Sequence, residues 1–175
     1  RSATGLSTAA PPPTGTFSVE KSSSAKPGVF RRPLNSVFTP VIALMRAPKI
    51  LVVHPDFPAR SVEELIALAK SRPSGISYAS AGIGSSAHLA GALFAQLAGI
   101  EMLHIPYRGI GPAITDILGG QTQALFPGLA AALPHIKAGK MRPLAVTGQK
   151  RHRLVPDVPT FDELGYKGFD GVQWY

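Results

Sequence analysis

From residue 38 onward, short apolar runs alternate with longer segments in which apolar residues recur at helical spacing. The short runs are fit for strands: IALM, ILVVH, ISYAS, MLHIP, TQALF and RPLAVT. The helical segments lie between them, at 61–72, 85–98, 111–119 and 131–138. Strands that alternate with helices in this way predict βαβ units. Several strands are apolar nearly throughout, so we expect an α/β fold: a mostly parallel sheet with helices on both faces.

Capping residues and proline predict where several of these helices begin. Ser61 and Glu64 have the spacing of a capping box, which begins the first helix. Thr160 and Glu163 have the same spacing and predict a short final helix. Pro112 is expected at the first position of the third helix. The second helix is expected to turn four side chains toward the core: Leu89, Leu93, Phe94 and Leu97.

Residues 1–37 differ from the rest of the chain. They are rich in Ser, Thr, Pro, Gly and Ala, and they show neither the period of a strand nor that of a helix. Such a segment buries too little apolar area to offset the entropy of ordering it. We therefore expect an irregular or flexible arm at 1–37 and one folded lobe over 38–175.

Composition and charge exclude some functions. The chain has no cysteine, which excludes disulfides, thiolate nucleophiles and cysteine-based metal sites. Its net charge is +8, but half of this excess lies in 1–37, where five basic residues face one acid. Basic residues after position 37 are scattered and are not interleaved with aromatic ones, so we expect no nucleic-acid partner. No charged start followed by an apolar run is visible, so we expect no signal peptide within this sequence.

A glycine-rich connection joins the strand ISYAS to the second helix. Gly82, Gly84 and Ala87 fit the spacing G-x-G-x-x-A of a dinucleotide-binding loop. That fold also needs an acid at the end of the next strand, where this chain has Pro106–Gly109 instead. A nicotinamide cofactor is therefore disfavoured, and we expect none. Glycines before a helix N-terminus still suit a small anion, a carboxylate or a phosphate, although they could equally form only a tight turn.

Three connections that follow strands supply the candidate ligand-binding residues, because function in such folds gathers at the carboxyl ends of the strands. The candidates are Ser80, Ala81, Gly82, Ile83, Gly84, Ser85, Ser86, His88, Tyr107, Arg108, Gly109, Pro127 and Gly128. The Arg108 side chain could pair with a ligand carboxylate or with solvent. The backbone of its loop is expected to face the cleft.

Ser85 and His88 lie three residues apart on one helix face, which raises a Ser–His hydrolase as an alternative. The nucleophile motif G-x-S-x-G is absent, and no acid is placed nearby to orient the imidazole. The five histidines are dispersed, so we expect no metal site. We expect His88 to orient the glycine-rich loop and His104 to be a histidine satisfied within its strand.

Three longer motifs occur in order: PYRG-x-x-PA, PHIKAGK-x-R-x-LAVT and R-x-x-x-x-PDVPT-x-x-E-x-G. Over residues 38–175 the chain resembles the substrate-binding receptors of tripartite tricarboxylate transporters, also called Bug proteins. The resemblance implies a periplasmic receptor with two α/β lobes of the periplasmic binding protein type II kind. Such a receptor captures a small carboxylate, passes it to membrane permease subunits and performs no chemistry. It also implies that largely backbone donors and waters hold the carboxylate, here at Ser80–Ser86 with His88 and at Tyr107–Gly109.

The first lobe of that family begins with a strand and a loop P-G-G-x-x-D, which residues 1–37 do not contain. The resemblance therefore places 38–175 as the second domain of a truncated two-lobed receptor. Two alternatives stay open: a nucleotide-dependent or Ser–His enzyme on the same core, and a truncated lobe without function.

Overall fold

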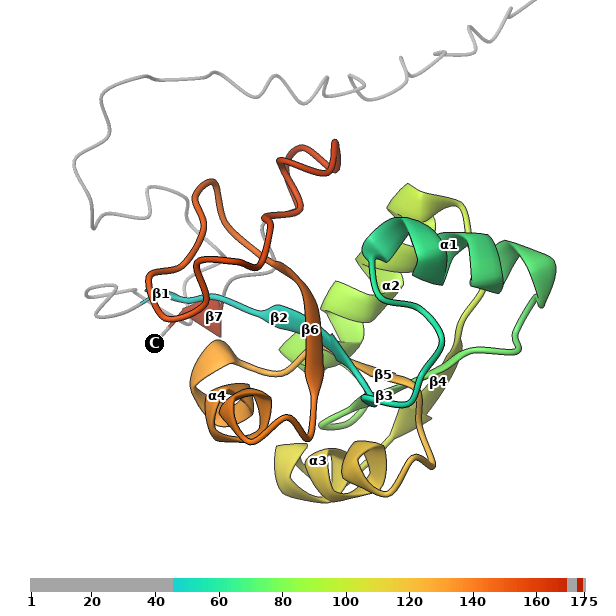
Figure 1. The fold of residues 1–175 in the computed structure, drawn as a ribbon. Helices are drawn as coiled ribbons and strands as arrows, with labels where there is room; N and C mark the ends of the chain where they lie inside the picture. The colour runs from blue at the N-terminus through green and yellow to red at the C-terminus, as the bar shows by residue number, and fades with distance from the viewer. Residues whose placement is uncertain (1–45, 170–172, 175) are drawn as a thin grey trace, which may run out of the picture. The chain divides into compact units, whose positions relative to one another are not determined.

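A computed structural model describes residues 46–169 and 173–174 (Figure 1). The predicted arm at 1–37 and the run IALM lie outside the described residues. In the described part, a two-stranded antiparallel pair joins β1 (Arg46–Ala47) and β7 (Gln173–Trp174). None of the described helices is both long and apolar enough to cross a membrane.

Within the described residues, the main sheet has five strands in the order β4-β3-β5-β2-β6. Their bounds are β2 Ile50–Val53, β3 Ser77–Ser80, β4 Leu103–Pro106, β5 Ala124–Leu125 and β6 Arg142–Val146. Strand β3 pairs in parallel with β4 and β5, whereas β2 pairs antiparallel with β5 and β6. Four strands therefore point the same way, which confirms a mostly parallel sheet. In this sheet, only β2 runs antiparallel to the other strands. The sequence did not predict this direction, because uniform burial of a strand does not encode it.

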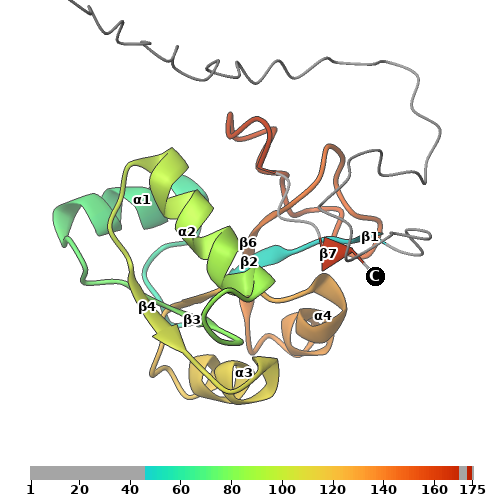
Figure 2. The same cartoon turned by 180° about the vertical axis from the view of Figure 1, so that it is seen from behind.

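Helices cover both faces of the sheet, as expected (Figures 1 and 2). Their bounds are α1 Val62–Ser71, α2 Ser86–Ala98, α3 Ile110–Leu118 and α4 Leu129–Lys137. Along β2, Leu51 and Val53 join the core under α1 and α2, while Ile50 and Val52 join the core over α3 and α4. This alternation, combined with complete burial, places β2 between two helical layers.

The first helix begins as predicted. Ser61 is its N-cap, with the hydroxyl accepting from the Glu64 amide at 3.2 Å. Pro112 lies at the third position of α3 rather than the first, because the helix already begins at Ile110 after Gly109. Helix α4 likewise begins earlier than predicted, at Leu129.

The predicted final helix is wrong. Thr160 and Glu163 do form both capping-box contacts, at 3.1 and 3.4 Å, but they close a turn. Gly165 and Gly168 follow with φ of 89° and 79°, a left-handed backbone that ends the turn before a helix develops.

The predicted inward stripe of α2 is also largely wrong. Leu89 and Leu97 are 58% and 47% exposed, Leu93 is half-buried, and only Phe94 is fully buried. The buried stripe consists of small residues with Phe94: Ala87, Ala90, Gly91 and Phe94. A Cβ at Gly91 would collide with the Tyr78 ring, so the helix lies too close to the sheet for large side chains on this face.

Candidate functional site

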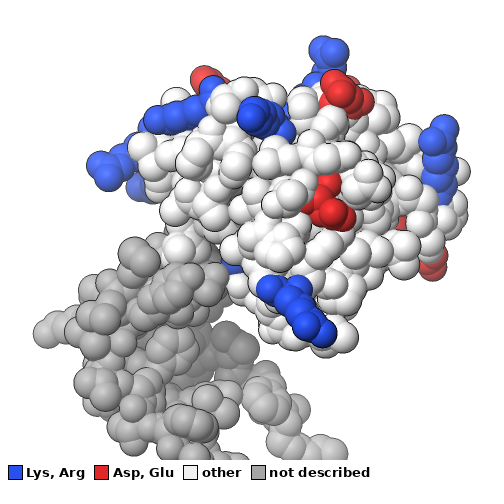
Figure 3. Space-filling model, turned by 90° about the horizontal axis from the view of Figure 1, so that it is seen from below, with Lys and Arg blue, Asp and Glu red and all other residues white. Residues whose placement is uncertain are grey.

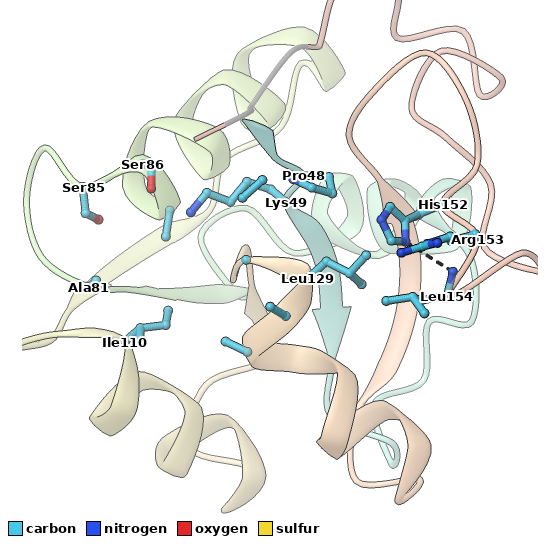
Figure 4. Close-up of a pocket in the computed structure, with 15 residues that line it drawn as sticks. Pro48, Lys49, Ala81, Ser85, Ser86, Ile110, Leu129, His152, Arg153 and Leu154 are labelled. Atoms are coloured by element: carbon cyan, nitrogen blue, oxygen red, sulfur yellow. Dashed lines mark hydrogen bonds between the residues drawn. The ribbon is translucent and has the colours of Figure 1, made fainter. Parts of the chain in front are cut away.

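A pocket of about 740 Å³ lies where three helices begin (Figure 4). Its lining comes from the starts of α2, α3 and α4, from the segment before β2 and from the loop after β6. The lining residues are Ala47, Pro48, Lys49, Ala81, Ser85, Ser86, Ala87, Ile110, Gly128, Leu129, Ala130, Ala131, His152, Arg153 and Leu154.

The glycine-rich loop forms a fixed turn at one wall of this pocket. Gly82 and Gly84 have φ of 125° and 78°, values that favour glycine. The Ser85 hydroxyl caps α2 by accepting from the main-chain amide of His88 at 3.2 Å. The His88 ring in turn accepts from the Gly84 amide through Nδ1 at 3.1 Å. His88 therefore orients the loop as predicted, and these contacts leave the Ser85 hydroxyl bonded to the His88 main chain rather than to its imidazole.

Ser80 and His104 hold the base of the same loop. Ser80 is fully buried, and its hydroxyl lies 2.7 Å from His104 Nε2 and accepts from the Gly82 amide at 3.1 Å. The His104 ring also stacks on Tyr78 and His88, with centroid distances of 5.0 and 4.1 Å. Burial, and secondarily the neighbouring His88, lower the pKa of His104. The strand histidine is satisfied, as predicted, and Ser80 supports the loop from below.

The loop around Tyr107 packs against the glycine-rich loop instead of facing the pocket with its backbone. The amides of Tyr107 and Gly109 donate to the carbonyls of Ser80 and Ala81 at 3.0 and 3.3 Å. The Tyr107 hydroxyl donates to Asp116 in α3. Burial and this hydrogen bond raise the pKa of Tyr107 to about 12. Ile110, the first residue of α3, follows this loop and lines the pocket.

Four of the thirteen predicted ligand-binding residues line the pocket: Ala81, Ser85, Ser86 and Gly128. The other nine lie outside the lining: Ser80, Gly82, Ile83, Gly84, His88, Tyr107, Arg108, Gly109 and Pro127. Of these, Arg108 is exposed and Ile83 is 84% exposed, while the Pro127 carbonyl accepts from the Ile50 amide.

Sequence reasoning missed Lys49, which lines the pocket although it is only 4% exposed. Its amide donates to the Thr147 hydroxyl at 2.8 Å, and its carbonyl accepts from the Thr147 amide at 2.9 Å. Burial lowers the pKa of Lys49. Because β2 runs antiparallel to its neighbours, its first residues lie at the edge where β3 and β5 end. A lysine directly before an apolar strand was the available signal.

The loop 152–154 after β6 was also missed as a pocket wall. Within it, His152 Nδ1 accepts from the Leu154 amide at 3.3 Å, and Arg153 is exposed. The sequence did mark the end of this strand as a place for function, but it named no residue there.

The lining of the pocket is electropositive. Among the described residues, the lining includes Lys49 and Arg153 and no acidic residue. Helices α2, α3 and α4 also carry no acid in their first turns. Each helix start contributes main-chain donors and about half a positive charge. On the face in Figure 3, Lys and Arg are spread among Asp and Glu with uncharged surface between them. In the described residues, no three potential metal ligands gather.

Comparison with known proteins agrees with the motifs. The family model described as "Tripartite tricarboxylate transporter family receptor" matches residues 6–175. Protein BugT of Bordetella pertussis is 39% identical over 136 residues, 78% of this chain and 42% of that protein. The structure of the periplasmic binding protein BugD is 38% identical with a TM-score of 0.71, covering 74% of this chain and 43% of that one.

A second solved structure is that of Rpa4515 from R. palustris with adipate. It is 37% identical with a TM-score of 0.74, and the match covers 78% of this chain and 46% of that one. The chain thus spans less than half the length of each of these three proteins.

Proposed function

Because the chain belongs to the family of tripartite tricarboxylate transporter receptors, we propose that it is part of a periplasmic receptor for a small carboxylate. Residues 38–175 form the second of two lobes, and the pocket at the starts of α2, α3 and α4 is this lobe's share of the binding cleft. The receptor delivers its ligand to membrane permease subunits and makes or breaks no covalent bond.

The observation that carries this proposal is the meeting of three helix N-termini in one pocket whose described lining residues include no acid. A carboxylate accepts hydrogen bonds from main-chain amides and is stabilised by the positive end of each helix dipole. The adipate in the related Rpa4515 structure supports a carboxylate as the ligand class.

The contacts of the serines and histidines support binding without catalysis. A hydrolase needs a serine hydroxyl that gives its proton to an imidazole and that substrate can reach. Ser85 accepts from a main-chain amide, and Ser80, the serine beside His104, is fully buried. These residues shape the loop that borders the pocket.

The test is an NMR titration of the isotope-labelled chain with malonate, succinate, glutarate and adipate. The diamide of each acid serves as an uncharged control of similar shape. We expect the acids, and not the diamides, to shift the amide signals of 85–87 and 129–131. One lobe offers half a cleft, so we expect dissociation constants in the millimolar range, about −4 kcal/mol.

The alternative of a lobe without function gives a different result. In that case no acid shifts these signals more than its diamide does. A response confined to amides outside the pocket would also contradict the proposed site.

A further inference from the structure

Lys49 is a buried cation in a pocket that is already electropositive. It lies directly before β2, and an isolated bridge pairs it with Gly128, the N-cap of α4. Both of its main-chain groups are bound to Thr147. The main chain of Lys49 is therefore held between the N-cap of α4 and the residue that follows β6. This fixes the position from which its side chain extends.

The side chain of Lys49 extends toward Ser86, in the first turn of α2 (Figure 4). A helix N-terminus favours an anion and disfavours a cation. An ammonium group that is withdrawn from water is also unfavourable, and burial does lower the pKa of Lys49. A carboxylate bound beside Ser86 would interact favourably with the ammonium group of Lys49 and with the start of α2.

We propose that Lys49 is a ligand-binding residue that makes the pocket select a carboxylate over an uncharged group of the same shape. This inference rests on the proposed function. It adds a charged side chain to the backbone donors and waters that are expected to hold most of the carboxylate. It also assigns the charge selectivity to one named side chain.

Arg153 is the other Lys or Arg among the described lining residues, but its setting differs. It is exposed, so water and salt screen its charge. Lys49 is buried, where a charge-assisted hydrogen bond is stronger than in water. Lys49 therefore governs selectivity, and Arg153 contributes little to it.

The test compares adipate with its uncharged diamide, adipamide, by NMR titration of the full chain and of Lys49→Met. In the wild type, adipate binds and adipamide does not bind detectably. In Lys49→Met, the affinity for adipate falls by about 10- to 100-fold, the range expected for a buried charged hydrogen bond. Adipamide stays below detection in Lys49→Met or becomes detectable, and the spectrum of the ligand-free variant should match that of the wild type away from residue 49, whereas simple damage to the pocket would change it.

Three further variants serve as controls. Lys49→Arg keeps the charge and should restore most of the preference for adipate. Arg153→Gln should change adipate affinity by less than about threefold. Lys70→Met removes an exposed lysine at the end of α1, away from the pocket lining, and should change nothing.

A measurement on the wild type covers the case in which Lys49→Met fails to fold. Adipate should raise the pKa of Lys49, read from the side-chain carbon signal, because a bound carboxylate favours the charged amine. His152 and Arg153 also line the pocket, and their charges could affect the pKa of Lys49. The same titration is therefore repeated in Arg153→Gln. An unchanged Lys49 pKa, or an unchanged preference in a folded Lys49→Met, overturns this inference alone. If no acid shifts the amide signals of the wild type, both this inference and the proposed function are wrong.

Discussion

Helices α1 and α2 begin with the same kind of N-cap but differ in the charge of their first turns. Each has a serine at the N-cap whose hydroxyl accepts from the amide three residues later. The first turn of α1 contains Glu63 and Glu64, and the Glu64 carboxylate accepts from the Arg60 amide at 2.6 Å. The first turn of α2 contains no acid, nor do those of α3 and α4.

This difference separates a helix start that serves the fold from one that suits a ligand. Carboxylates of α1 itself neutralise its positive end and bind a nearby donor. At the three helices of the pocket, no lining residue in the described part of the chain is acidic. A serine cap alone thus says little about ligand binding, and the charge of the first turn is the more informative feature.

The largest expected effect comes from giving a pocket helix the acidic first turn of α1. Ala130 is exposed, lies at the second position of α4 and lines the pocket. In Ala130→Asp, we expect adipate affinity to fall by roughly 100-fold or beyond detection, since juxtaposed like charges cost several kcal/mol. The free energy of unfolding should not fall, and should rise by about 0.3–1 kcal/mol, because the acid favours the helix N-terminus.

Ala130→Asn is the matched control, because it has nearly the same shape without the charge. We expect it to bind adipate within a few-fold of the wild type. If Asn weakens binding as much as Asp, the effect is steric, and the electrostatic contrast between α1 and the pocket helices is wrong. NMR titration and urea unfolding measure the two quantities.

The two helices also pack differently, and this sets where their ends lie. Helix α1 buries Val62, Leu65 and Ile66, whereas α2 buries mainly alanine and glycine. Gly91 lies over the ring of Tyr78 at a distance that no side chain would permit. The close approach of α2 holds its first turn at the end of β3, beside the pocket.

Gly91→Ala should therefore lower the free energy of unfolding by about 1–3 kcal/mol, the usual cost of overpacking a core. Gly111→Ala is the control: it lies in the first turn of α3, and a Cβ there meets nothing within 4 Å. We expect that control to be neutral or to stabilise by up to about 1 kcal/mol, since alanine favours a helix over glycine. Equal effects of the two substitutions in urea unfolding would refute the packing argument.

Most of the fold was predictable from the sequence because its signals are local. Apolar runs and caps located β2 to β6 and the four helices within a few residues. The α2 face was not predictable from side-chain size, because the close contact between Gly91 and Tyr78 joins residues that are distant in sequence. The turn at Thr160 was mistaken for a helix because a capping box forms equally well in one isolated turn.

The candidate site was predictable only in part, for one structural reason. The rule that function lies at the carboxyl ends of parallel strands located Ala81, Ser85, Ser86 and Gly128. Lys49 precedes its strand, so the same rule excluded it. It reaches the pocket because β2 is antiparallel, and strand direction depends on pairing between distant segments.

The smallest expected effect concerns pH, because imidazoles rather than carboxylates stand beside the start of α2. His88 accepts from the Gly84 amide, and His104 lies against both His88 and Ser80. The folded state lowers the pKa of His104 below its ordinary value of 6.5, so the unfolded chain takes up the proton first. The contribution of neutral His104 to the free energy of unfolding is therefore complete above pH 6.5 and is lost as the pH falls below 6.5.

Urea unfolding of the wild type and of His104→Gln, at one pH above 6.5 and one pH below it, tests this. We expect the wild type to lose more stability on acidification than the variant, whose glutamine can still bond to Ser80 but does not titrate. The α1 cap is the same in both proteins, so its response to acid cancels in the comparison. A wild type that loses no more than the variant would show that protonation of His104 costs the fold nothing.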